Sequence, residues 1–218
     1  MANIIVGIDE AGRGPVLGPL VMAALAFKEE DIKKLEWLGV KDSKLLTKLV
    51  REELFDQIRE IVHDFRIEVI EPDAIDLSVS GQGSNLNWLE ADTSARMISE
   101  LKPTKAIVDC PSINLVSYKN YLMNQLTCKP ELIVEHKADM NYLAVAAASV
   151  IAKVIRDRQV ERVKVDIGID FGSGYMSDPK TQEFLKNYSE EHAILFRKSW
   201  KSYKNVEDKK KQKSLEDF

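Results

Sequence analysis

Short runs of aliphatic and β-branched residues recur along the chain and predict buried or half-buried strands. The expected strands cover residues 3–8, 20–27, 65–70, 105–109 and 131–135. A turn rich in glycine and proline separates the first two strands, which predicts a hairpin. The later strands alternate with helical patterns. Two strands in tandem followed by strand–helix alternation indicate an α/β domain with a mixed sheet.

Apolar residues spaced three and four positions apart predict the helices. They are expected over residues 47–63, 85–101, 115–126 and 141–164. Thr47 is expected to cap the first of these helices, and Pro103 follows the end of the second. The last is expected as one long helix, rich in alanine in its first half and charged in its second. Short helices are expected from Asp178, and a charged tail from Glu207.

The composition restricts the class of protein. The chain has 218 residues, of which 44% are hydrophobic and 30% charged, with a net charge of -4. This is enough apolar surface for one substantial core. No apolar run reaches the roughly 18 residues of a membrane span, and no signal peptide is expected, so we expect a cytoplasmic protein without membrane contact. Cys110 and Cys128 match no zinc spacing and are expected to be buried or half-buried thiols.

Positive charge is concentrated locally, although the whole chain is acidic. Residues 153–164 contain five basic residues against two acidic ones, and residues 197–213 contain eight basic residues against Glu207 and Asp208. Local stripes of this kind matter more for contact with phosphates than net charge does.

Acidic residues follow three of the expected strands. Asp9 and Glu10 end the first strand, Asp109 ends the strand over residues 105–109, and Asp139 lies shortly after Glu135. Any one of them alone is compatible with a surface acid or a helix cap, and Asp139 in particular suits an N-cap. If the strands are neighbours, the four carboxylates converge. They would then repel one another and raise one another's pKa unless cations bind.

Hard divalent cations such as Mg²⁺ take oxygen ligands. Two such ions about 3.5–4 Å apart activate a water molecule and stabilise a leaving oxygen in phosphodiester cleavage. An acidic cluster combined with basic helices therefore predicts a metal-dependent nuclease.

The motifs resemble those of a known family. The segments that carry the resemblance are GIDEAGRGPVLGPLV, VKDSKLL, AIVDCP, EHKAD, VAAASVIAKVIRDR and FGSGYMSDPKT. The chain resembles ribonuclease HII, the type 2 ribonuclease H, and most closely its archaeal form. The 30 positions between Asp109 and Asp139 match the archaeal and eukaryotic arrangement.

The resemblance implies an RNase H-like fold, with a mixed five-stranded sheet flanked by helices and a small helical C-terminal region. It implies a catalytic domain over residues 1–178, a helical region over 179–206 and a flexible charged tail over 207–218. It further implies that Asp9, Glu10, Asp109 and Asp139 are the catalytic acids and hold two ions, Mg²⁺ or Mn²⁺.

The implied reaction is hydrolysis of the RNA strand of RNA–DNA hybrids and cleavage 5′ to single ribonucleotides in duplex DNA. The products carry 3′-hydroxyl and 5′-phosphate ends. The implied roles are ribonucleotide excision repair and primer removal, and the expected form is a monomer.

Two glycine-containing motifs are implied in substrate binding. Gly12, Arg13 and Gly14 match the family motif that senses the 2′-hydroxyl at the RNA-to-DNA junction, where glycines let the backbone approach the sugar. A dinucleotide-binding loop is excluded, because the glycine after Gly14 is Gly18 and the GxGxxG spacing is broken. A plain hairpin turn is the simpler alternative. Tyr175 matches the tyrosine that stacks on the deoxyribose after the ribonucleotide.

Two lysines, Lys44 and Lys153, resemble phosphate-binding lysines of the family; without the resemblance each would be interpreted as a surface charge. His136 precedes Asp139 by three residues, which would suit protonation of a leaving group, but we assign it no role.

The chain ends in QKSLEDF. Gln212, Leu215 and Phe218 have the spacing of the motif by which replication and repair enzymes bind the sliding clamp. One 3₁₀ turn would place Leu215 and Phe218 on the same side. A frayed polar terminus is the alternative.

Two other functions are compatible with part of this pattern. One is another RNase H-like nuclease, against which the GRG loop and the GSGY tyrosine argue. The other is a non-catalytic module that binds hybrids or the clamp. Four carboxylates argue against a pure binder, because they concentrate negative charge near phosphates.

Overall fold

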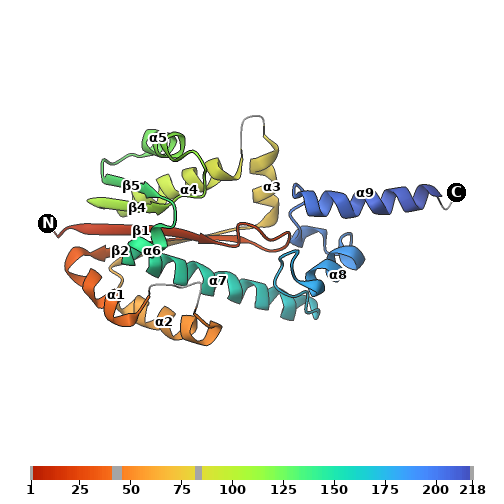
Figure 1. The fold of residues 1–218 in the computed structure, drawn as a ribbon, viewed down its shortest axis with the longest axis horizontal. Coiled ribbons are helices and arrows are strands. Elements are labelled where there is room, and N and C mark those ends of the chain that lie inside the picture. The colour runs from red at the N-terminus through yellow and green to blue at the C-terminus, as the bar shows by residue number, and fades with distance from the viewer. Residues whose placement is uncertain (1, 41–45, 82–84, 217–218) are drawn as a thin grey trace. The chain divides into compact units, whose positions relative to one another are not determined.

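The computed structural model describes residues 2–40, 46–81 and 85–216 (Figure 1). They form two compact units. The sheet unit comprises Met1–Ala11, Val21–Val69 and Leu86–Arg156, and the helical unit comprises Gly12–Leu20, Ile70–Asn85 and Asp157–Phe218. Both units are assembled from separate stretches of the chain, so the expected boundary between residues 178 and 179 does not coincide with the division.

The sheet has five strands in the order β3-β2-β1-β4-β5. They are β1 (Ile4–Ala11), β2 (Leu20–Lys28), β3 (Asp64–Ile70), β4 (Lys105–Asp109) and β5 (Glu131–Glu135). β1 is antiparallel to β2 and parallel to β4, and β4 is parallel to β5. The expected mixed five-stranded sheet is confirmed. Because β1, the central strand, and its neighbour β4 are parallel, they end at the same edge of the sheet.

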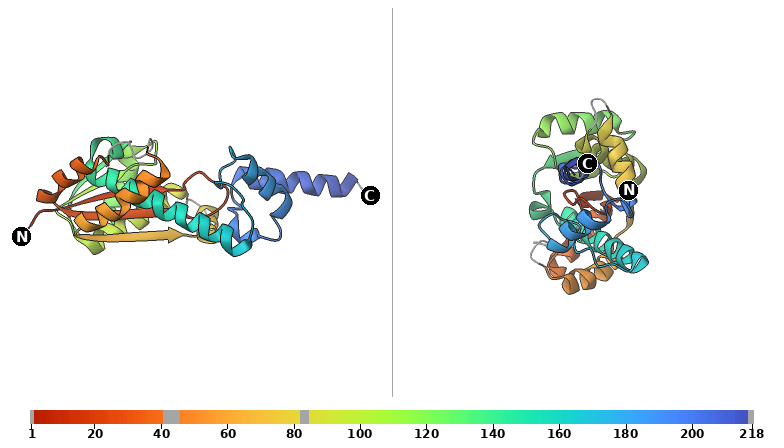
Figure 2. Two further views of the ribbon diagram at one scale, coloured as in Figure 1. Left: turned by 90° about the horizontal axis from the view of Figure 1, so that it is seen from below. Right: turned by 90° about the vertical axis from the view of Figure 1, so that its right-hand side faces the viewer.

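Helices cover both faces of this sheet. They are α1 (Ile32–Leu38), α2 (Lys48–Ile61), α4 (Leu86–Leu101), α5 (Leu115–Gln125), α6 (Ala138–Asn141) and the first part of α7 (Leu143–Ile167). A 3₁₀ turn, Glu29–Asp31, precedes α1. Figure 1 shows α4 and α5 on one face and α1, α2 and α7 on the other, and the views in Figure 2 agree. Thr47 caps α2 as expected, since its hydroxyl accepts the N–H of Val50.

The single long helix expected over residues 141–164 is confirmed as α7 (Leu143–Ile167), with its bounds shifted by two or three residues, but the short helix before it was not expected. A short helix, α6, ends at Asn141, and α7 begins at Leu143 after an extended Tyr142. The Asp109 carboxylate accepts the N–H of Ala138, the first residue of α6, at 2.8 Å. Asp139 is not an N-cap. It lies in the first turn of α6, whose N-cap is Lys137.

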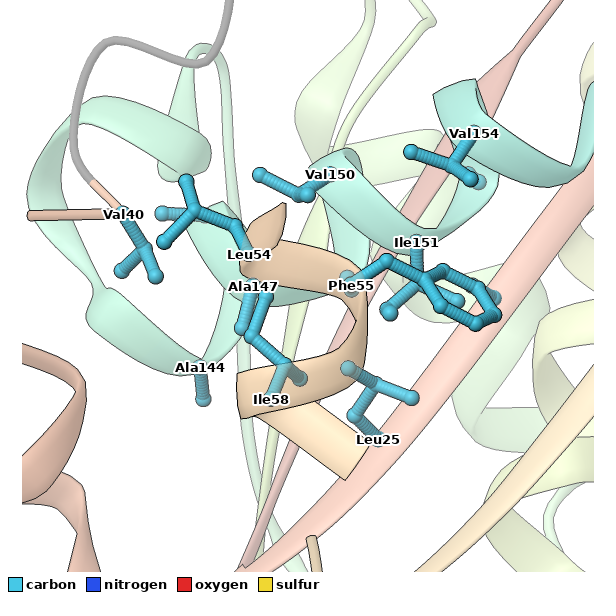
Figure 3. Close-up of a cluster of buried hydrophobic side chains, with 14 of the residues drawn as sticks. Leu25, Val40, Leu54, Phe55, Ile58, Ala144, Ala147, Val150, Ile151 and Val154 are labelled. Carbon is cyan, nitrogen blue, oxygen red and sulfur yellow. The ribbon is translucent and has the colours of Figure 1, made fainter. Parts of the chain in front are cut away.

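The alanine-rich half of α7 packs directly on β1. A Cβ atom on Gly7 would lie 2.2 Å from the carbonyl carbon of Ala144, so only glycine allows this approach. Figure 3 shows the adjoining core, in which Leu25 of β2, Phe55 of α2 and Ile151 of α7 meet among other buried side chains. Small residues on α7 thus fix the helix against the strand that carries Asp9 and Glu10.

The helical unit has its own aromatic core. It contains α3 (Pro72–Ser80), the second part of α7, α8 (Pro179–Tyr188), a 3₁₀ turn (Ala193–Leu195) and α9 (Lys201–Glu216). Phe171 and Phe196 pack on Phe184, with ring centroids 5.3 and 5.6 Å from its own. None of the helices in the described ranges has the length and apolar content needed to cross a bilayer.

The flexible tail expected from residue 207 is helical as far as Glu216. Two contacts hold this part of α9 in the helical unit. The Ser189 hydroxyl donates to the Glu207 carboxylate at 2.7 Å, and the Lys210 ammonium donates to the Ser189 hydroxyl at 2.5 Å. The high charge of this segment predicted a flexible tail. The prediction failed because Ser189, the contact partner of this segment, lies well before it in the sequence.

Candidate active site

Two of the four predicted acids lie at the end of β1. Asp9 is buried, with 5% of its surface exposed, and Glu10 is half-buried. The Asp9 carboxylate accepts the N–H of Glu10 at 2.8 Å. This bond fixes the Asp9 side chain against its own strand.

The other two acids, Asp109 and Asp139, lie near the end of β4. Ile8 pairs with Val108 in parallel register, so Asp9 and Asp109 follow at matching ends of adjacent strands. Asp109 is half-buried and accepts the N–H of Ala138, the residue before Asp139. Asp139 is 5% exposed. Strand register and one hydrogen bond therefore bring the four acids to one edge of the sheet.

The electrostatics of this edge disfavour a charged Asp9. The pKa of Asp9 is raised to about 6, mainly by burial and also by the negative charge of Asp109, while a hydrogen bond from Ser149 and the charge of Lys153 act in the opposite direction. A divalent cation would favour the ionised form. The donors are carboxylate oxygens, which suit a hard cation.

Ser149 is a site residue that the sequence patterns did not reveal. It is fully buried on α7, and its hydroxyl accepts a hydrogen bond from the ammonium of Lys153. Lys153 was expected as a phosphate-binding lysine, and the structure places it within electrostatic range of Asp9. The four-residue spacing on one helix face was the available signal.

His136 contacts the segment that follows Asp109. Its Nδ1 lies 3.0 Å from the carbonyl oxygen of Cys110. Cys110 is buried, as expected, and burial raises the pKa of its thiol. The histidine thus contacts the backbone next to an acid.

In the helical unit, the two glycine motifs lie together. Gly12 has a φ of 85°, which favours glycine. A Cβ atom on Gly14 would lie 3.6 Å from Cε1 of Tyr175, and the Val16 N–H donates to the Gly174 carbonyl at 3.0 Å. Tyr175 is 38% exposed. The residues predicted to read the ribose and to stack on the next sugar are therefore neighbours.

The Tyr175 loop is held by side chains at the start of α8, those of its N-cap Asp178 and of Thr181. In this loop Gly172 has a φ of 77°, and a Cβ atom there would lie 2.4 Å from the Asp178 carboxylate. Asp178 accepts the Ser173 N–H at 2.7 Å, and the Thr181 hydroxyl accepts the Gly174 N–H at 3.0 Å. The glycines therefore serve this loop geometry as well as exposing the tyrosine.

Some predicted residues fall outside these clusters. Lys44 and Phe218 lie outside the described residues. Gln212 and Leu215 lie in α9, where Gln212 is exposed.

The family model for ribonuclease HII matches residues 6–203. The chain belongs to the ribonuclease HII family. It is 43% identical to ribonuclease HII of Thermococcus sibiricus over 97% of this chain and 96% of the relative. It is 47% identical to that of Methanococcus maripaludis strain C7 over 94% of this chain and 87% of the relative.

Solved structures agree with this assignment. The ribonuclease H2 from Pyrococcus horikoshii OT3 superposes with a TM-score of 0.86 and 37% identity, covering 94% of this chain and 98% of that one. The chain in a PCNA:RNase HII complex from Archaeoglobus fulgidus superposes with a TM-score of 0.82 and 41% identity, covering 91% and 95%. The expected family and fold are confirmed. The chain is therefore a metal-dependent endoribonuclease of the ribonuclease H class.

Within the described ranges, no three or more His, Cys, Asp or Glu side chains form a ready cluster for a metal ion.

Proposed function

We propose that the chain hydrolyses the RNA strand of RNA–DNA hybrids and cuts duplex DNA 5′ to a single embedded ribonucleotide. The products would carry 3′-hydroxyl and 5′-phosphate ends. The observation that carries the hydrolytic part is the buried Asp9 beside Asp109 at the shared edge of β1 and β4, with the pKa of Asp9 raised to about 6. A binding protein has no use for such a destabilised carboxylate beside phosphates.

Asp9, Glu10, Asp109 and Asp139 would hold the metal, and we propose two ions of Mg²⁺ or Mn²⁺. When bound, such a pair lowers the pKa of a water molecule and stabilises a leaving oxygen. The bond from the Ala138 N–H holds Asp109, and the Glu10 N–H holds Asp9. The protein therefore orients the carboxylates, and its own side chains need supply no nucleophile.

Lys153 fits a role in binding a substrate phosphate. Its ammonium donates to the buried Ser149 hydroxyl and lies within electrostatic range of Asp9. A cation held in this way can bind a phosphate near the carboxylates while limiting their repulsion of the substrate. Lys44 is proposed for the same role from its motif alone.

The helical unit supplies the proposed recognition of the sugar. The loop of Gly12, Arg13 and Gly14 offers backbone groups to the 2′-hydroxyl, which alone distinguishes RNA from DNA at one position. Tyr175 lies against Gly14 and is exposed enough to stack on the next deoxyribose. A 2′-hydroxyl on that next sugar would hinder the stacking. Removal of single ribonucleotides from DNA and of RNA primers would follow from this preference.

Four duplex substrates test the proposal: one with a single ribonucleotide, one with a continuous RNA strand, one all-DNA and one with a single 2′-fluoro nucleotide. We expect cleavage of the first two only, with Mg²⁺ or Mn²⁺ and not with a chelator. Mapping the ends should show a cut 5′ to the ribonucleotide. Cleavage of all-DNA duplex would favour another RNase H-like nuclease, and binding without cleavage would favour a non-catalytic module.

The C-terminus is proposed to bind the sliding clamp through Gln212, Leu215 and Phe218. The Archaeoglobus fulgidus relative comes from a structure of the PCNA:RNase HII complex. In this chain Gln212 and Leu215 lie in α9. Binding as a 3₁₀ turn therefore requires the end of α9 to unwind locally.

Deletion of residues 212–218 tests this proposal. The truncated chain should lose binding to the clamp in a pull-down and cleave free duplex at the normal rate, because the residues removed are the proposed contact alone. A matched control replaces the exposed Lys209 with glutamine and keeps the motif. Clamp binding that survives the deletion would refute the proposal.

A further inference from the structure

One buried arginine holds the loop that begins at Gly12. Arg197 is fully buried, and its guanidinium donates to three backbone carbonyls of this loop. Nη2 donates to Gly12 at 2.6 Å, and Nη1 donates to Arg13 at 2.9 Å. Nε and Nη2 both donate to Gly18, at 3.1 and 2.9 Å. The guanidinium carbon lies 5.0 Å from the ring centroid of Trp200.

These contacts span both ends of the loop. The Arg197 N–H also donates to the Val16 carbonyl at 2.9 Å, and the Gly18 N–H donates to the Leu195 carbonyl at 3.0 Å. Burying a guanidinium is costly, and here neutral carbonyls and an aromatic face compensate for that cost. A lysine would retain the charge, but it lacks the planar fork that reaches several carbonyls at once.

The bonds determine where the loop's own donors point. All peptide bonds of the described residues are trans, and in a trans peptide the C=O and N–H point in opposite directions. The Gly12 carbonyl shares a peptide with the Arg13 N–H, and the Arg13 carbonyl shares one with the Gly14 N–H. With both carbonyls turned toward Arg197, both N–H groups are turned away from it. Gly14 is exposed.

We propose that Arg197 is a positioning residue for recognition of the ribose. By holding the Gly12 and Arg13 carbonyls, it presents the Arg13 and Gly14 N–H groups to the 2′-hydroxyl of the substrate. The inference rests on the proposed function, in which this loop reads the 2′-hydroxyl. It adds the residue that sets the loop's orientation, and it predicts that loss of Arg197 relaxes the preference for a ribonucleotide.

The test measures binding, so that cleavage does not interfere. Arg197→Lys and Arg197→Gln are made in the Asp109→Asn chain, and Kd is measured for a duplex with one ribonucleotide and for the matched all-DNA duplex. With Arg197 intact, the first should bind more tightly. Both variants should lose about 10-fold or more of this preference, the loss expected for misplaced hydrogen bonds in a desolvated contact. Lys198→Gln, at an exposed neighbour, is the matched control and should keep the preference.

The outcomes separate the two proposals. If the Asp109→Asn chain with Arg197 intact shows no preference, the proposed function fails. If it shows the preference and both variants keep it, or bind both duplexes more weakly by the same factor, Arg197 has only a structural role and the inference is overturned.

A second measurement on the Asp109→Asn chain does not depend on the folding of the Arg197 variants. The buried guanidinium should give slowly exchanging NMR signals. These signals should shift when the ribonucleotide duplex binds and shift much less with the all-DNA duplex. Equal shifts with both duplexes would also overturn the inference.

Discussion

At the scale of single residues, burial determines how the carboxylates behave. Asp9 and Asp139 are each 5% exposed, whereas Glu10 and Asp109 are half-buried. The surroundings of Asp9 raise its pKa to about 6, and the largest cause is desolvation. Sequence position could predict that these acids share an edge of the sheet, but it could not reveal burial, nor the buried Ser149 beside Asp9.

The raised pKa predicts how stability depends on pH in metal-free buffer. The pKa of Asp9 is about 6 in the folded chain and 3.8 ordinarily, so the folded state favours the protonated form. The stabilisation that the protonated Asp9 contributes to the folded state is fully present below about pH 4. It is lost as pH rises through about 6. Asp9→Asn removes the charge, and should stabilise the chain by about 1–3 kcal/mol at pH 8 and much less at pH 4.

Denaturant unfolding with a chelator present, at both pH values, measures this effect. Asp170→Asn is a control of opposite sign. Hydrogen bonds from Lys180 and the Gly172 N–H lower the pKa of Asp170, so its stabilising contribution is present at neutral pH and is lost as pH falls. That variant should be less stable than the unchanged chain at pH 8. An Asp9→Asn chain less stable than the unchanged one at pH 8 would contradict the account.

At the scale of elements, close contact between β1 and α7 positions the site. Periodicity predicted the bounds of β4 and β5, because short apolar runs between turn residues are distinctive. It missed α1, which buries only Leu35, and α3, which begins at a proline. It placed α7 within two or three residues of its bounds, at 141–164 against Leu143–Ile167, and it missed the four-residue α6.

The contact between β1 and α7 is most sensitive to substitution at Gly7. In Gly7→Ala the added Cβ would lie 2.2 Å from the Ala144 carbonyl carbon and 2.4 Å from the Val145 nitrogen. Because both contacts are with backbone, β1 and α7 would have to separate. We expect the free energy of unfolding to fall by about 3 kcal/mol or more, measured by denaturant titration.

Gly14→Ala is the matched control for stability, since its Cβ would meet only Cε1 of Tyr175 at 3.6 Å, an ordinary contact. Its free energy of unfolding should change by less than about 1 kcal/mol. Equal stability of the Gly7 and Gly14 variants would show that the packing of α7 on β1 is looser than described.

At the scale of the whole molecule, each unit is assembled from interleaved segments. The chain leaves the sheet unit at Gly12, returns at Val21 and leaves again after Val69. A sequence boundary drawn where composition changes could not find this division. Contacts such as Arg197 with Gly12, 185 positions apart, are invisible to periodicity and to local charge. The motifs predicted the chemistry, and the structure adds the side chains that hold those motifs in place.

The central claim is that carboxylates at the end of β1 and β4 carry metal-dependent hydrolysis. The most direct test compares the unchanged chain with Asp109→Asn on a duplex containing one ribonucleotide, over a titration of Mg²⁺ and of Mn²⁺. We expect the variant to bind the duplex with Kd changed by no more than a few-fold and to cleave at least about 1,000-fold more slowly with either ion. Cleavage by Asp109→Asn at a rate near that of the unchanged chain would contradict it.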